Sequence, residues 1–105
     1  MDNIRGKVVV VTGAARGSGR ATAEALLARG ARVVIGDRDV AVLEKTVTEL
    51  NRAGQVSGYP LDVTDPESFA TFLDKARADG DGHLDALINT AGAPPGGPVL
   101  AHSDH

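Results

Sequence analysis

Three glycines at short spacing, in the stretch VTGAARGSGRA, suit a loop that lets a phosphate approach the backbone. Gly13, Gly17 and Gly19 follow a run of valines and precede a helical pattern. The unpaired N–H groups at the start of such a helix favour a pyrophosphate. Glycine would make the tight turn at 13, permit close approach at 17 and allow helix–strand contact at 19. We expect a phosphate-binding loop, with a purely structural turn as the alternative, because glycine clusters are weakly specific.

An acidic residue lies at the distance that a ribose-binding carboxylate requires. Asp37 ends a second β-branched run, 18 residues after Gly19. A carboxylate there accepts hydrogen bonds from ribose hydroxyls and repels a 2′-phosphate, which favours NAD over NADP. Arg16 and Arg38 leave the NADP alternative open, because either guanidinium can pair with a 2′-phosphate. A second alternative is a charged turn in which Asp39 caps the next helix.

The elements that must position these residues alternate between strand and helix patterns. β-Branched runs predict strands at residues 7–12, 31–36, 55–63 and 84–90. Helical patterns begin at Ser18, after the cap at Asp39, and at Thr64, where a capping-box spacing is followed by a proline in the first turn. This order predicts an α/β fold, a doubly wound parallel sheet joined by right-handed crossovers.

Composition narrows the class of protein. The chain has 105 residues, enough for one domain or part of one, and a net charge of −3, which argues against nucleic acid as a partner. It contains no cysteine, and no apolar run approaches a membrane span. We therefore expect a soluble cytoplasmic protein without a membrane partner. A metal site is not expected, because the histidines of the terminal sequence HSDH lack a supporting shell.

Several motifs in order resemble the short-chain dehydrogenase/reductase family. Thr12 to Gly19 is similar to that family's T-G-x-x-x-G-x-G loop, and Leu61 to Thr64 to the end of its third strand. Asn89 to Gly92 resembles the N-N-A-G segment, and Leu84 to Ile88 matches the usual approach to it. Ser18 departs from the usual isoleucine, and Thr90 replaces the second asparagine.

The resemblance implies a Rossmann-like fold and assigns the adenine side of a cofactor site. Asp62 would accept a hydrogen bond from the adenine amino group, and Val63 would flank the ring. The alternative for Asp62 is a strand-end turn residue. Ser18 would cap the helix or reach a phosphate oxygen.

The resemblance also assigns the nicotinamide side. Asn89, Ala91 and Gly92 would shape the wall near the nicotinamide ribose. The alternative for Asn89 is a buried amide that satisfies backbone groups, and both roles can hold at once.

The family resemblance implies catalysis by serine, tyrosine and lysine, and no residue here can be assigned that role. The single tyrosine, Tyr59, is not followed by a lysine four positions later. We therefore expect residues 1–105 to be an incomplete Rossmann domain, truncated after the fourth strand. The parent would be a homo-oligomeric NAD(P)-dependent oxidoreductase that interconverts a small alcohol and a carbonyl. The rival interpretations are a non-catalytic NAD-binding module and an interaction fragment that pairs through its bare fourth strand.

Overall fold

Strands and helices alternate along the whole of the described chain, as the sequence predicts. The computed structural model describes residues 4–14 and 17–89. The elements are β1 (Val8–Thr12), α1 (Gly17–Ala28), β2 (Arg32–Asp37), α2 (Val40–Leu50), β3 (Val56–Pro60), α3 (Pro66–Asp79) and β4 (Ala86–Asn89). All strand pairs are parallel, in the order β3-β2-β1-β4. Within these residues, no helix has the length and apolar character needed to cross a membrane.

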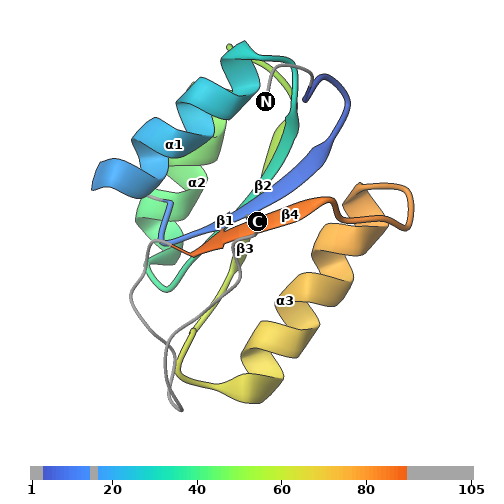
Figure 1. Ribbon diagram of the computed structural model, residues 1–105. Coiled ribbons are helices and arrows are strands. Elements are labelled where there is room, and N and C mark those ends of the chain that lie inside the picture. The colour runs from blue at the N-terminus through green and yellow to red at the C-terminus, as the bar shows by residue number, and fades with distance from the viewer. Residues whose placement is uncertain (1–3, 15–16, 90–105) are drawn as a thin grey trace.

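The helices cover both faces of the sheet, which confirms the doubly wound α/β architecture. α1 and α2 lie on one face and α3 on the other (Figure 1). β1 is buried along its whole length, and its valines serve both cores: Val9 and Val11 pack towards α1 and α2, whereas Val10 packs towards α3. A strand covered on both faces has no polar face, which explains the unbroken apolar run.

Two strand boundaries differ from the predicted ones by two residues or more. β3 ends at Pro60 instead of residue 63. The Asp62 carboxylate accepts a hydrogen bond from the backbone N–H of Thr64 at 3.0 Å, which turns the chain out of the strand. β4 begins at Ala86 instead of residue 84, because Ala86 pairs with Val9 and β1 has no strand residue to pair with Leu84.

The start of α3 corrects the predicted capping box. The N-cap is Asp65, whose carboxylate accepts a hydrogen bond from the N–H of Glu67 at 3.0 Å. Thr64 is therefore not the cap, and its hydroxyl donates to Asp62 instead. Pro66 occupies the first turn as expected, since a helix start does not require its missing N–H.

Candidate functional site

The glycine-rich stretch lies where β1 passes into α1. The ends of the parallel strands β1, β2 and β4 lie near the beginnings of α1 and α2 (Figure 1). Gly13 has a φ of 70°, and its N–H donates to the carbonyl of Gly36 at 2.8 Å, which ties the turn to the end of β2. Gly17 has a φ of 66°, and a Cβ added there would meet no atom within 4 Å. Gly19 is buried in α1. Of these three glycines, Gly17 is therefore the one shown to have open space beside its backbone.

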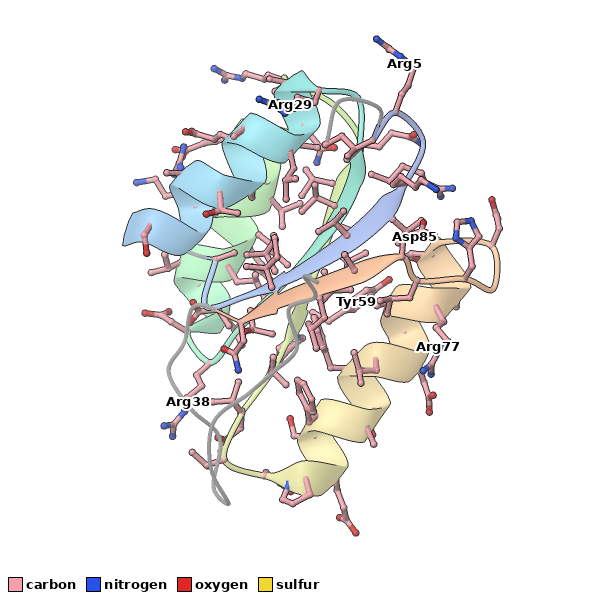
Figure 2. The ribbon with its side chains drawn as sticks, viewed as in Figure 1. Arg5, Arg29, Arg38, Tyr59, Arg77 and Asp85 are labelled. Carbon is pink, nitrogen blue, oxygen red and sulfur yellow. The ribbon has the colours of Figure 1, made fainter. Side chains whose placement is uncertain are left out.

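A pocket at the strand ends brings together residues that are distant in sequence. It has a volume of about 230 Å³. Four of the predicted site residues line it, namely Gly13, Asp37, Arg38 and Val63. We call it the strand-end pocket; its remaining lining residues are Gly36, Leu61 and Thr64. Arg38 lies at this edge of the molecule, far from Asp85 at the other end of the sheet (Figure 2).

The two acidic residues of this region are held by local hydrogen bonds. Asp37 Oδ1 accepts from the N–H of Asp39 at 3.0 Å. Asp62 Oδ1 accepts from the Thr64 hydroxyl at 2.6 Å as well as from its N–H. These two bonds, with the hydroxyl contributing most, lower the pKa of Asp62, and the charge of Arg38 lowers it further. Asp62 is therefore held as a carboxylate that can only accept hydrogen bonds.

Asn89 lies at the end of β4 beside the end of β1. Its side-chain Oδ1 accepts a hydrogen bond of 2.6 Å from the hydroxyl of Thr12, and the two residues are partners in the strand register. Thr12 is fully buried. The Asn89 side chain is half-buried, and the partner of its oxygen is a side-chain hydroxyl and not a backbone group. Its role as a buried amide that satisfies backbone groups and its place near a nicotinamide ribose both stay predictions.

The remaining predicted residues divide into two groups. Arg16, Ala91 and Gly92 lie outside the described residues. Ser18 is exposed and is the second residue of α1, so the prediction that it caps the helix is wrong, because a cap precedes the first helical residue. Its contact with a phosphate stays a prediction.

Sequence reasoning missed two residues that fix Asp62. Thr64 holds its carboxylate, and the Ser68 hydroxyl accepts a hydrogen bond from its backbone N–H at 3.0 Å. The Asp-x-Thr spacing was the available signal for Thr64, because an aspartate commonly bonds the backbone two residues on. Ser68 had no such local signal, since it reaches Asp62 from α3 across a turn.

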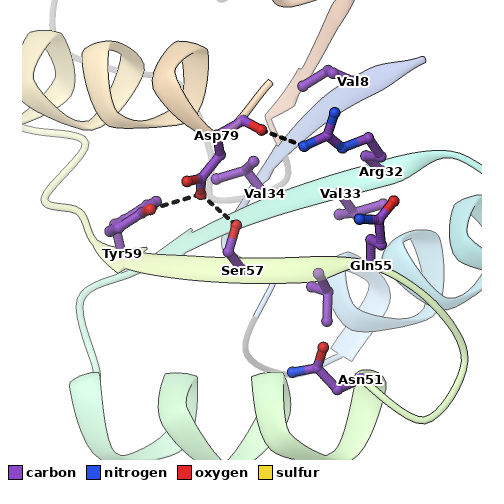
Figure 3. A pocket seen from close by; sticks show the side chains of 10 residues that line it. Val8, Arg32, Val33, Val34, Asn51, Gln55, Ser57, Tyr59 and Asp79 are labelled. Atoms are coloured by element: carbon purple, nitrogen blue, oxygen red, sulfur yellow. Dashed lines mark hydrogen bonds between the residues drawn. The ribbon is translucent and has the colours of Figure 1, made fainter. Parts of the chain in front are cut away.

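A second pocket lies between β3 and the end of α3. It has a volume of about 320 Å³ and shares no lining residue with the strand-end pocket. Ser57 and Tyr59 both donate to Asp79 Oδ2 at 2.6 Å, and Arg32 donates to the Asp79 carbonyl (Figure 3). The bond to Asp79 and partial burial raise the pKa of Tyr59 to about 12. Ser57 and Tyr59 therefore use their hydroxyl groups to connect β3 to the end of α3. Tyr59 does not line the strand-end pocket.

Comparison with known proteins places this geometry in one family. The family model described as short chain dehydrogenase matches residues 7–105. The chain is 43% identical over 98 residues to the 3-oxoacyl-[acyl-carrier-protein] reductase FabG of Escherichia coli, an alignment covering 86% of this chain and 36% of that protein. The chain therefore spans about a third of the length of this relative.

Solved structures agree with the sequence match. A short-chain dehydrogenase/reductase from Burkholderia phymatum in complex with NAD gives a TM-score of 0.76 at 36% identity, over 83% of this chain and 31% of that one. The Pseudomonas aeruginosa RhlG/NADP complex gives a TM-score of 0.77 at 35% identity, over 88% of this chain and 37% of that one. Sequence motifs, sheet order and both comparisons lead to the same conclusion: the chain belongs to the short-chain dehydrogenase family.

Proposed function

We propose that this chain is the dinucleotide-binding portion of an NAD(P)-dependent oxidoreductase that interconverts an alcohol and a carbonyl by hydride transfer. The observation that carries the proposal is the strand-end pocket, where the Gly13 turn, Asp37 and Val63 meet beside Asp62. The bound cofactor would supply the hydride donor or acceptor. The chain's own residues would hold and orient it.

The residues present fit such a cofactor. Gly17, where an added Cβ would meet no atom within 4 Å, leaves space for a pyrophosphate at the start of α1, where the helix dipole favours negative charge. Asp37, at the end of β2, would accept hydrogen bonds from the adenosine ribose. Leu61 and Val63 give the pocket apolar walls against which an adenine ring can lie.

We propose NAD as the preferred cofactor. Asp37 lies in the pocket as an anionic side chain, and a second anion, Asp62, lies just beyond it, which disfavours a 2′-phosphate. Arg38 lines the same pocket and opposes this preference, although its charge also acts on Asp62. The carboxylate of Asp37 therefore decides the selectivity.

Titration of the chain with NADH and with NADPH, followed by cofactor fluorescence, tests both proposals. Asp37→Asn removes the charge and keeps the side-chain shape, so we expect the preference for NADH over NADPH to fall by about tenfold. Asp39→Asn is the matched control, because it removes a neighbouring charge and keeps a good helix cap. Equal changes in both affinities for Asp37→Asn would refute the selectivity argument, and no binding of either cofactor at millimolar concentration would refute the site.

A non-catalytic NAD-binding module is the second candidate for the chain by itself. Tyr59 is the chain's single tyrosine, and its hydroxyl is engaged by Asp79 in the pocket between β3 and α3. Hydride exchange between NADH and a ketone, measured with the chain alone, should stay at the uncatalysed rate under both candidates. Turnover above the uncatalysed rate would contradict the proposal that this portion only binds.

A further inference from the structure

Thr64 makes two hydrogen bonds to the same oxygen of a neighbouring carboxylate. Its N–H lies 3.0 Å and its hydroxyl 2.6 Å from Asp62 Oδ1. Thr64 is exposed and Asp62 is half-buried, so a lone aspartate here would still rotate among several rotamers. Two donors on one oxygen define the plane of the carboxylate. Among the described residues, no hydrogen bond is made to Asp62 Oδ2.

The backbone of Asp62 is fixed from another direction. Its N–H donates to the Ser68 hydroxyl on α3 at 3.0 Å. The main chain and the side chain of Asp62 are therefore held by separate residues. Thr64 itself lines the strand-end pocket, together with Arg38 and Val63. Asp62 is not itself a lining residue, but its neighbours Leu61 and Val63 are, so Asp62 lies beside the pocket with one carboxylate oxygen that accepts no hydrogen bond from the described residues.

We propose that Thr64 is a positioning residue that orients the Asp62 carboxylate to accept the amino group of an adenine ring. This inference rests on the proposed function, because it requires an adenine nucleotide in the strand-end pocket. The Thr64 hydroxyl holds Oδ1 and leaves Oδ2 to the ligand. The hydroxyl also competes with Arg38, whose charge attracts the same carboxylate. Without it, Asp62 keeps only the hydrogen bond from the Thr64 N–H, and the attraction of Arg38 turns the carboxylate away from the adenine more easily.

The cofactor-free chain provides the first test. Carbon-detected NMR titration of the Asp62 carboxyl should give a pKa below its ordinary value, because the Thr64 hydroxyl stabilises the charged form. Thr64→Val should raise this pKa, and Thr64→Ser should keep it low. Thr48→Val is the matched control, since the Thr48 hydroxyl donates within α2 to the Glu44 carbonyl and Thr48 does not line the strand-end pocket. Identical Asp62 titrations in Thr64→Val and the wild type would overturn the inference.

Cofactor binding provides the second test. Thr64→Val should lower the affinity for NADH by about threefold, the effect of one exposed hydrogen bond, and Thr64→Ser should keep the wild-type affinity. Reduced nicotinamide mononucleotide, which lacks adenosine, should bind the wild type and Thr64→Val equally. In an Asp62→Asn background the Thr64→Val effect should disappear, because the two residues act as one unit. An undiminished effect in that background would overturn the positioning role.

The two tests distinguish a failure of the role proposed for Thr64 from a failure of the proposed function. If Thr64→Val moves the Asp62 pKa while the wild-type chain binds no NADH, the proposed function fails and the adenine role of Thr64 fails with it. If NADH binds the wild type and Thr64→Val alike, the function stands and the role of Thr64 is refuted.

Discussion

A single methyl group at Gly36 should destabilise the fold and loosen the glycine turn together. Gly36 lies on β2 facing α3, and a Cβ there would be 2.7 Å and 2.8 Å from two ring carbons of Phe72 and 3.0 Å from Leu61. Phe72 is 1% exposed, so its ring has no free space to enter. Overpacking of this kind costs about 1–3 kcal/mol. Alanine recovers about 0.4–1 kcal/mol by restricting the unfolded chain.

The net expectation for Gly36→Ala is a loss of about 1–2 kcal/mol in the free energy of unfolding. Urea unfolding followed by circular dichroism should show a midpoint lowered by about 1 M. The Gly36 carbonyl also receives the Gly13 N–H, so NADH affinity should fall with it. Gly54→Ala is the control, because its Cβ would lie 3.3 Å from Leu27, a contact that small adjustments relieve.

A double-mutant cycle with Phe72→Leu identifies the cause. Leucine lacks the ring carbons that meet the new methyl group, so the double variant should lose less stability than the two single variants added together. Additive losses would refute the steric explanation. An unchanged urea midpoint for Gly36→Ala would refute the packing argument itself.

Two further predictions concern ionisable groups. The Val8 N–H donates to the Asp85 carboxylate at 2.8 Å and lowers the pKa of Asp85. This bond therefore stabilises the fold fully above the pKa that Asp85 has in the unfolded chain, and the stabilisation is lost as the pH falls through its pKa in the folded chain. Asp85→Asn should therefore lower the free energy of unfolding most at neutral pH. Below about pH 4 the stability of the variant should approach that of the wild type, as urea unfolding at each pH will show. Ultraviolet absorbance should give Tyr59 a pKa near 12, and Asp79→Asn should return this pKa towards 10. Because this pKa is raised, the stabilisation is full below pH 10 and is lost as pH rises through about 12; a wild-type value near 10 would contradict the hydrogen bond to Asp79.

The order of elements was predictable because it depends on local patterns. β-Branched runs closed by glycine and helices with polar caps are readable from neighbouring residues. Asp37 was predicted to end the second strand, and it does. The end of β3 and the start of β4 were not predictable in the same way. They depend on an aspartate turn at Asp62 and on the register with β1, which no single segment encodes.

The residues that line the strand-end pocket were predictable where their spacing along the chain indicates them, whereas contacts made by packing were not. Glycines after a strand and an aspartate at the end of the next strand have fixed spacings in this fold. By contrast, the hydrogen bond from Thr12 to Asn89 joins residues from two separate strands, and Ser68 reaches Asp62 from a helix. Such contacts exist only once the sheet and its helices are assembled.

The pairing of β4 with β1 also has a consequence for the time course of folding. β1 and β2 follow each other in the chain, whereas the Thr12–Asn89 bond closes a separation of 77 residues. Contacts between distant segments form slowly, because the intervening chain must lose its freedom first. On the ribosome, β1, β2 and β3 emerge and can pair before β4 is synthesised. Until then one edge of β1 stays unpaired, and β4 pairs with it beside the glycine turn once it emerges.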